Sequence, residues 1–460
     1  MNVFRRLSDF MALLIRNILN HADEKFYEHY SALSLYRRNE IIGQLENILP
    51  ELITNGHSAK ISVSLCSEDF FSRLNSITQG QPNEQNMQVW VTLLSKLDIS
   101  MSKYAEYYSS DKEIRGINTN IDQTRIEFLP RVNCFWEHSS RGASHYNGLM
   151  NYLHYFYYID MDKTVPYEIR HLFLPHGTFE KARKRKVLRI GMSPLSNQGV
   201  LVIDTEIRED TGYFSVSEVK NSAVLEQTFR EVMKEFVRQE VDIGILPEML
   251  GNRQMQDRFA EQPVQYPEDG TEFPSLIVFP SIWEAQHNTV PVFDEMGDIV
   301  IQQEKQHGFL YPKSKREGYL EDLSPDRKIT LLHCEGVGRI AILVCKDALV
   351  TEYLQMVLNV LKVTLLIIPS FSTGNYDFQE VIQSCRVADC CACWINTCSV
   401  ANLEGADPDK LENIGAFLRC GRKSGFENGL IPCERKTRNC NGKGMQDCGH
   451  CVFLCKLPFG

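Results

Sequence analysis

The sequence has few features that would suit a membrane protein or a chain that binds nucleic acid over its whole surface. Its apolar stretches are short, and Val363–Pro369 is far below the roughly 20 residues that a membrane-spanning helix needs. Acidic residues outnumber basic ones by 59 to 49, and the net charge of −10 opposes general binding to nucleic acid. The basic run Lys181–Lys186 leaves a local phosphate contact open, although such runs usually form a solvent-exposed face.

An export signal is also lacking at the start of the sequence. Ser8 and Asp9 stand where the apolar part of a signal peptide should begin, and Met11–Ile15 is too short to form one. We therefore expect the 15 cysteines to lie in a reducing compartment, and the protein to be cytoplasmic. In that setting cysteines are thiols, metal ligands or a nucleophile rather than disulfides.

Cysteine is nearly absent from the first 330 residues, which hold only Cys66 and Cys134, whereas the last 130 residues hold thirteen. This uneven distribution indicates more than one domain, and 460 residues suit two or three domains of roughly 150 residues each. Residues 1–180 are predicted to form a mainly helical domain. Apolar residues recur there at helical spacing in Leu7–Ile18, Asn39–Leu49 and Gln88–Leu97.

Two further segments of this first region have a distinctive composition. Asn118–Gln123 is predicted to be a loop. Tyr152–Ile159 is rich in aromatic residues, which favours a buried core segment because aromatic runs usually fill cores. A surface on which nucleic-acid bases stack is the alternative interpretation.

After Lys186 the sequence alternates between short apolar runs and helical patterns, which predicts an α/β domain. The predicted strands are Val187–Gly191, Val241–Pro247, Leu276–Pro280, Val290–Phe293, Ile299–Ile301, Gly338–Val344, Val363–Pro369 and Cys390–Asn396. The predicted helices are Ala223–Gln239, Leu349–Leu361 and Phe378–Asp389.

Polar residues follow three of these strands directly. Glu248, Cys345 and Ser370 each stand at or just beyond a strand's carboxyl end. Sites in α/β folds commonly lie at such ends, because several strands deliver their side chains to one edge of a sheet. A cysteine at this position, with a base and a cation near it, is a candidate nucleophile.

The order of these elements resembles the nitrilase superfamily. Asp242–Glu248 is similar to a family strand that ends in Pro-Glu, and Gly338–Asp347 is similar to the Gly-led strand that ends in Cys-x-Asp. Leu366–Ser370 resembles the next strand, which ends in Pro-Ser. Ser384–Asp389 and Trp394–Asn396 resemble the helix with Arg-Ala and the following strand that ends in Asn.

The resemblance implies a Glu-Lys-Cys triad that hydrolyses or transfers at a non-peptide carbon–nitrogen bond. Cys345 would be the nucleophile and Glu248 the base. Lys305 would stabilise the oxyanion together with the backbone N–H of Lys346. The segment around Lys305 departs from the family in one respect, because Gln303 stands where a tyrosine is usual.

Two of these assignments have competitors in the sequence. Lys313 is the alternative to Lys305 as the third member of the triad. Many family members have a second glutamate after the lysine, for which Glu321 is preferred over Glu317. Asp347 is interpreted as a structural residue that caps the following helix.

The family fold is a four-layer α-β-β-α sandwich, which we expect over residues 186–420. The resemblance implies a small amide or nitrile as substrate, no required cofactor and assembly into a homo-oligomer. Residues 1–180 are foreign to the simple family members and suggest an unknown protein partner. Whether they contact nucleic acid stays open.

Residues 421–460 form a cysteine-rich tail in which the family's final strands are not clear. Cys448 and Cys451 form a Cys-x-x-Cys pair that suits a structural zinc, and Cys433 and Cys440 are the other two candidate ligands, although they are spaced more widely than in a zinc-finger pair. Unmetallated thiols and disulfides are the alternatives. Five other cysteines are interpreted as small core residues: Cys385, Cys390, Cys391, Cys393 and Cys398.

A second function from a different class stays open. The nitrilase-like domain could be a catalytically silent scaffold or a small-molecule sensor. Divergent domains of this kind occur joined to reverse transcriptases in bacterial phage defence, although this chain shows no polymerase motif. Convergence of the three catalytic positions in one place separates the two hypotheses.

Overall fold

The computed structural model describes residues 3–61, 66–109, 117–121, 124–136, 148–261, 273–312, 318–374, 376–403, 413–421, 425–432 and 451–459. The chain divides into two compact units. The first comprises residues 1–132, 141–165 and 171–175, and the second comprises 133–140, 166–170 and 176–460. Within the described residues, no helix is both long and apolar enough to span a bilayer.

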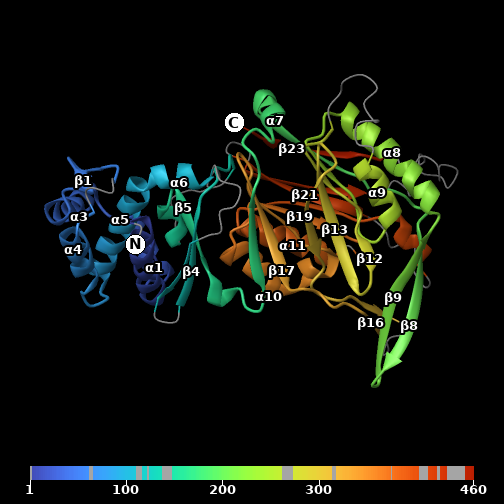
Figure 1. Ribbon diagram of the computed structural model, residues 1–460, viewed down its shortest axis with the longest axis horizontal. Coiled ribbons are helices and arrows are strands. Elements are labelled where there is room, and N and C mark those ends of the chain that lie inside the picture. The colour runs from blue at the N-terminus through green and yellow to red at the C-terminus, as the bar shows by residue number, and fades with distance from the viewer. Residues whose placement is uncertain are drawn as a thin grey trace. The chain divides into compact units, whose positions relative to one another are not determined.

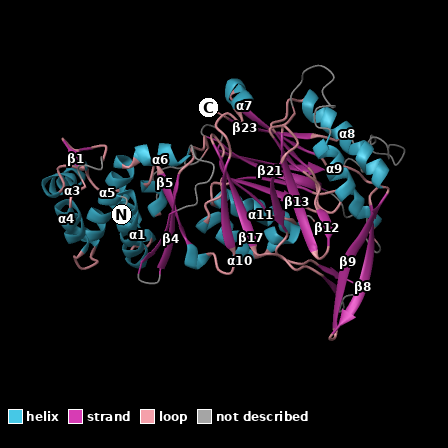
Figure 2. Ribbon diagram, viewed as in Figure 1, coloured by secondary structure: helices cyan, strands magenta, loops and turns pink. Residues whose placement is uncertain are grey.

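The first unit is built largely from helices (Figures 1 and 2). Its helices are α1 (Val3–His21), α2 (Glu24–Ser31), α3 (Leu35–Ile48), α4 (Glu68–Thr78), α5 (Glu84–Ser100) and α6 (Ser102–Ser109). Its strands are the pair β1 (Ile53–Thr54) and β2 (His57–Ser58), and the antiparallel sheet β3 (Ile117–Ile121), β4 (Thr124–Pro130) and β5 (Phe156–Asp160). The three helices expected from apolar spacing are confirmed as parts of α1, α3 and α5.

The loop predicted at Asn118–Gln123 is wrong over most of its length, because β3 pairs with β4 there. Polar residues in a short hairpin strand carry no apolar pattern that would reveal the strand. The aromatic segment Tyr152–Ile159 is confirmed as core: it contains most of β5, and the ring of Phe156 stacks on Phe128 with centroids 4.7 Å apart.

A buried carboxylate ties β5 to a helix of the same unit. Asp98 on α5 is fully buried and accepts hydrogen bonds at 2.6–3.2 Å from the backbone N–H groups of His154, Tyr155 and Phe156. These donors compensate part of the cost of burying a carboxylate. The start of the aromatic strand is thereby fixed to α5.

Within the described residues, two seven-stranded sheets are formed almost entirely by the second unit; their strands are magenta in Figure 2. The first has the order β12 (Ile282–Glu284), β13 (His287–Asp294), β11 (Leu276–Val278), β10 (Ile243–Ile245), β7 (Val187–Met192) and β23 (Phe453–Pro458), and β14 (Ile299–Glu304) pairs with β13. The second has the order β22 (Gly425–Pro432), β21 (Asn413–Gly421), β20 (Cys391–Ile395), β19 (Leu365–Pro369), β18 (Gly338–Ile342), β17 (Lys328–Cys334) and β6 (Glu168–Phe173).

In the part of the second unit that the structure describes, a smaller sheet and five α-helices accompany the two large sheets. The sheet has the order β15 (Leu310–Pro312), β16 (Gly318–Glu321), β9 (Thr211–Lys220) and β8 (Val200–Arg208), and β8 and β9 form a long projecting hairpin (Figure 1). The helices are α7 (Glu180–Arg185), α8 (Ser222–Arg238), α9 (Arg253–Glu261), α10 (Thr351–Gln355) and α11 (Tyr376–Val387). A π-helical turn, Met356–Val360, extends α10.

Helix α8 packs its apolar face on strands β7 and β10. The apolar stripe of α8 is buried, as its 3.6-residue spacing predicts. Phe236 on this stripe lies over the paired glycines Gly191 of β7 and Gly244 of β10. A Cβ atom would approach its ring to 2.9 Å at Gly191 and 2.6 Å at Gly244, so both positions require glycine for this contact.

The end of the chain contributes strands that were not identified in the sequence. β23 pairs antiparallel with β7 over its whole length, and β21 pairs with β20 and β22. The two large sheets also contact each other, since β21 contacts β23 and β14 contacts β17. The pairing of β23 with β7 makes direct neighbours of two segments that are far apart in the sequence, Val187–Met192 and Phe453–Pro458.

Candidate active site

Four polar side chains from different elements meet inside the second unit. Glu248 lies three residues beyond β10, and Cys345 begins the helical turn that follows β18. Lys305 directly follows β14, and Glu321 is the last residue of β16. All four residues are at most 3% exposed. The fold therefore collects side chains that are up to 97 positions apart into one dry cluster.

The amine of Lys305 joins the two carboxylates. Its Nζ donates to Oε1 of Glu248 at 2.8 Å and to Oε2 of Glu321 at 2.6 Å. The other oxygen of Glu248 accepts from the backbone N–H of Phe371 at 2.8 Å. Glu321 Oε2 also accepts from the backbone N–H of Phe309 at 3.0 Å. Both carboxylates are therefore held in fixed orientations.

The thiol of Cys345 lies beside this arrangement. Its Sγ is 4.0 Å from the carbonyl oxygen of Phe371 and within hydrogen-bonding reach of the Glu248 carboxylate. The backbone of Cys345 has a φ of +47°, a left-handed conformation that costs a non-glycine residue energy. Such a turn at a strand end projects the side chain away from the strand.

Burial and neighbouring charge shift the pKa values of these groups. Burial raises the pKa of Glu248, and repulsion from Glu321 adds to the rise, while Lys305 opposes it. Burial alone would lower the pKa of Lys305, but the two carboxylates raise it well above its ordinary value. Burial and the charge of Glu248 raise the pKa of the Cys345 thiol. The resting site thus holds a protonated amine and a protonated thiol at neutral pH.

Asp347 connects the two turns that carry the lysine and the cysteine. Its carboxylate accepts from the backbone N–H groups of Gln306 and His307, and its Oδ1 lies 3.0 Å from Nδ1 of His307. It also accepts from the backbone N–H of Val344 at 3.3 Å. The structural role expected for Asp347 is therefore broader than a helix cap, because it ties the segment after Lys305 to the segment before Cys345.

Several other residues named in the sequence analysis lie outside the carboxylate cluster or outside the described residues. Gln303, the departure from the family pattern, bonds the backbone of Lys328 and Thr330 on β17 and so links β14 to the other large sheet. Lys346 follows the nucleophile candidate in the same helical turn. Lys313 and Glu317, the competitors of Lys305 and Glu321, lie outside the described residues.

The predicted metal site falls mostly on residues whose structure is not described. Cys433, Cys440 and Cys448 lie outside the described residues, and Cys451 is partly exposed. In the described part of the chain, no group of three or more His, Cys, Asp or Glu side chains is arranged to hold a metal ion. The prediction of core cysteines is confirmed, because five of them are buried: Cys385, Cys390, Cys391, Cys393 and Cys398.

One residue of the cluster has no counterpart among the residues selected from the sequence. Asn288 on β13 is buried and donates from Nδ2 to Glu248 at 2.8 Å and to Glu321 at 3.3 Å. The predicted strand began at Val290, which left Asn288 outside it. A polar residue that continues the alternation of a buried strand was the available signal.

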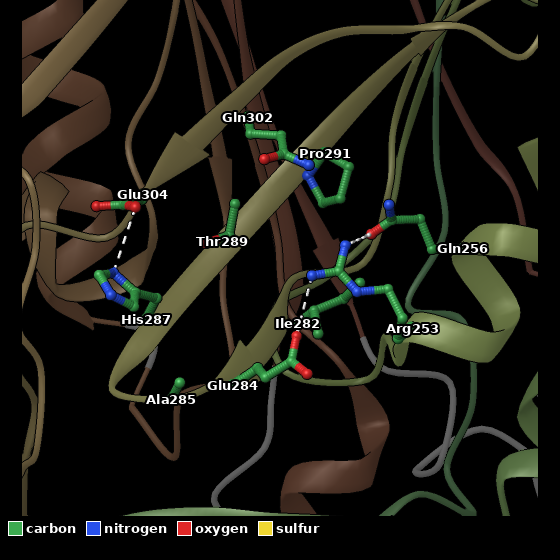
Figure 3. Close-up of a pocket in the computed structure, with 10 residues that line it drawn as sticks. All are labelled: Arg253, Gln256, Ile282, Glu284, Ala285, His287, Thr289, Pro291, Gln302 and Glu304. Atoms are coloured by element: carbon green, nitrogen blue, oxygen red, sulfur yellow. Dashed lines mark hydrogen bonds and ion pairs between the residues drawn. The ribbon is translucent and has the colours of Figure 1, made fainter.

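A separate groove of about 340 Å³ lies on the other face of β13 (Figure 3). His287 and Thr289, the neighbours of Asn288, line it, because successive residues of a strand point to opposite faces. The His287 ring lies 3.3 Å from Glu304, and Arg253 pairs with Glu284 at 3.0 Å (Figure 3). The groove and the buried carboxylate cluster therefore share a strand but lie on opposite sides of it.

Comparisons with known proteins find similarity only to solved structures, and at low sequence identity. No family model matches the sequence, and no curated protein matches it. Among solved structures, a glutamine-dependent NAD+ synthetase from Acinetobacter baumannii matches with 11% identity and a TM-score of 0.37, covering 59% of this chain and 45% of its own. An amidase from Nesterenkonia sp. matches with 14% identity and a TM-score of 0.35, covering 56% of this chain and 95% of its own.

Two further solved structures match at similar levels of identity. The C. elegans NitFhit protein has 13% identity and a TM-score of 0.33, covering 57% of this chain and 65% of its own. A mutant of the Nesterenkonia amidase, at 12% identity and a TM-score of 0.33, covers 56% of this chain and 93% of its own and is described as a member of the nitrilase superfamily. Likeness at this level assigns no activity, which has to follow from the site itself.

Proposed function

We propose that the second unit is a cysteine hydrolase of the nitrilase type, acting on a carbon–nitrogen bond of a small amide or nitrile. The observation that supports this proposal is the meeting of Cys345, Glu248 and Lys305 in one buried cluster with Glu321. A plain structural thiol would need neither a carboxylate nor an ammonium beside it. The two seven-stranded sheets would then be the inner layers of an α-β-β-α sandwich.

For an amide, the first half of the reaction forms a thioester. The Sγ of Cys345 attacks the carbonyl carbon while its proton moves to Glu248, whose raised pKa suits a general base. Lys305, with the backbone N–H of Lys346, stabilises the oxyanion. Collapse of the tetrahedral intermediate breaks the carbon–nitrogen bond, and the leaving amine takes the proton back from Glu248.

The second half regenerates the thiol. Glu248 accepts a proton from water as the water oxygen attacks the thioester carbon. Collapse of this second intermediate breaks the carbon–sulfur bond, releases the carboxylic acid and returns the proton to sulfur. No step in this sequence requires a cofactor.

The proposal is tested by following ammonia release from a panel of small amides and nitriles. The full chain should hydrolyse at least one of them, and Cys345→Ala should lose that activity. Cys334→Ala is the matched control, since Cys334 is a buried cysteine at the opposite end of the β17–β18 pair.

A second readout uses covalent labelling instead of turnover. A haloacetamide should alkylate Cys345 in the folded protein, as peptide mapping would detect, and the label should be lost in Cys345→Ala. A chain that hydrolyses nothing on the panel and leaves Cys345 unlabelled would instead support the catalytically silent scaffold.

A further inference from the structure

Asn288 lies beside two buried carboxylates that share a single cation. Glu248 and Glu321 are both buried, and Lys305 is the cation that they share. Two carboxylates and one ammonium leave one negative charge without a cation inside the cluster. Burying such a charge is costly unless hydrogen-bond donors surround it.

Besides the ammonium of Lys305, each carboxylate accepts from one backbone N–H and from the side chain of Asn288. Phe371 donates its N–H to Glu248, and Phe309 donates its N–H to Glu321. Asn288 differs because its Nδ2 donates to both, at 2.8 Å to Glu248 and 3.3 Å to Glu321. Among the described residues, it is the neutral side chain that bridges the two carboxylates.

Strand pairing fixes this amide in place. The backbone N–H of Lys305 donates to the carbonyl oxygen of Asn288 at 2.8 Å, which extends the pairing of β13 with β14 by one position. Asn288 and Lys305 are thus neighbours on adjacent chain segments, and both reach the same two carboxylates. His287 and Thr289 point the other way, into the groove of Figure 3.

The carbonyl oxygen of the Asn288 side chain indicates that this residue acts as a donor. The Oδ1 atom of Asn288 is buried and has no hydrogen-bond partner among the described residues. An unused buried acceptor is a cost, and it remains only because Nδ2 is needed on the other side. Aspartate has nearly the same shape but offers oxygens where the carboxylates need a donor.

We propose that Asn288 is a positioning residue that bridges Glu248 and Glu321 around Lys305 and favours the ionised form of Glu248. It touches no reacting atom and acts through Glu248, the proposed base. The inference rests on the proposed hydrolase function for its catalytic consequence, whereas the bridging itself can be tested without a substrate.

The catalytic test is the pH dependence of kcat/KM on an amide that the wild-type chain hydrolyses. Asn288→Ala removes a donor that favours the ionised carboxylate, so the acid limb should move to higher pH. Lys305, Glu321 and Cys345 are the titratable groups that face Glu248, and they remain in this variant. Activity at neutral pH should fall about tenfold to a hundredfold.

Asn288→Asp separates bridging from packing. If the side chain only fills space, the nearly isosteric aspartate should be milder than alanine. If it bridges carboxylates, aspartate adds a third negative charge and should be the more damaging change. An aspartate variant milder than the alanine variant would overturn the proposal.

The test that needs no substrate compares unfolding at two pH values. The stability lost in Asn288→Ala should be greater at pH 8 than at pH 5, because the amide stabilises charged carboxylates. Asn396→Ala is the matched control: Asn396 is also buried but bonds the backbone of Ser372, so its loss should not depend on pH. A loss in Asn288→Ala that is independent of pH would count against bridging.

Two outcomes are kept apart by this design. If the wild-type chain hydrolyses no amide but the loss of stability depends on pH, the proposed function fails while the bridge stands. If turnover is present and neither the acid limb nor the pH dependence changes, the role of Asn288 fails alone. Asn288→Ser, which keeps one donor, replaces the alanine variant if that variant does not fold, and the same pH signs are expected of it.

Discussion

The amine nitrogen of Lys305 lies 2.6 Å from Oε2 of Glu321, slightly closer than its 2.8 Å from Oε1 of Glu248. The second glutamate is thus as much a partner of the lysine as the proposed base is. Because both carboxylates are buried with a single ammonium, the charge and hydrogen bonds of Lys305 are divided between Glu248 and Glu321. The other oxygen of Glu248, Oε2, accepts from the backbone N–H of Phe371, and the carboxylate is within hydrogen-bonding reach of Cys345.

Glu321→Gln should therefore impair catalysis more than it impairs folding. The amide keeps an acceptor for Lys305 while removing the carboxylate that lacks its own cation, so the change in unfolding free energy should be small. Activity should fall by about 10- to 100-fold, because a neutral amide holds the Lys305 ammonium in place less tightly than a carboxylate does. Steady-state kinetics and chemical denaturation measure the two effects. Asp322→Asn, which alters a carboxylate paired with Arg208, should leave turnover nearly unchanged.

Lys305→Met should impair folding as well as catalysis. Removing the cation leaves two buried carboxylates facing each other, and breaking a buried ion pair costs about 3–5 kcal/mol. The carboxylates would then bind protons more tightly in the folded state than in the unfolded state. Stability should consequently fall as pH rises, which denaturation at pH 5 and pH 8 would detect. Lys328→Met, at a partly exposed lysine paired with Asp326, should show no comparable loss.

Much of the site could be predicted because its residues follow apolar strands. Glu248 and Cys345 stand at strand ends that local hydrophobicity identifies, and Lys305 follows a third strand directly. Glu321 was the preferred second carboxylate, and the structure places it on Lys305. In each case a buried strand fixes where its end must lie, so a short pattern carries information about the tertiary structure.

The rest depended on contacts between distant segments. Glu321 reaches the cluster because β16 pairs with β9, and the end of the chain completes a sheet because β23 pairs with β7. Asn288 looks like an ordinary polar residue in the sequence, and the contact of Asp347 with the segment after Lys305 appears only in the folded chain. No local periodicity encodes such pairings.

In the first unit, Asp98 should make stability depend on pH. Burial raises the pKa of Asp98 to about 6 from an ordinary 3.8, although the backbone N–H groups of His154, Tyr155 and Phe156 oppose the rise. The Asp98 carboxyl therefore binds a proton more tightly in the folded state than in the unfolded state. Protonation of Asp98 stabilises the fold fully below pH 3.8, and this stabilisation is lost as pH rises through about 6. The change amounts to about 3 kcal/mol.

Asp98→Asn should remove this dependence, because the amide oxygen still accepts but carries no charge. Hydrogen exchange of the amides at His154–Phe156, corrected for intrinsic rates, reports on the contact directly. Asp69→Asn, at an exposed carboxylate on α4 of the same unit, should keep the wild-type dependence. Equal pH profiles for the Asp98 variant and the wild-type chain would show that this carboxylate does not titrate with folding.

Glu248→Gln should separate turnover from the reactivity of the thiol. Burial raises the pKa of Cys345 most, the charge of Glu248 adds to the rise, and Lys305 opposes it. A neutral glutamine removes the contribution of the Glu248 charge and leaves that of Lys305, so a haloacetamide should still label Cys345 at neutral pH. Hydrolysis should nevertheless fall by about 10²- to 10⁴-fold, because no base remains to receive the thiol or water proton. Peptide mapping and ammonia release measure the two activities on one sample. A variant that hydrolyses at the wild-type rate would exclude Glu248 as the base, whatever its labelling.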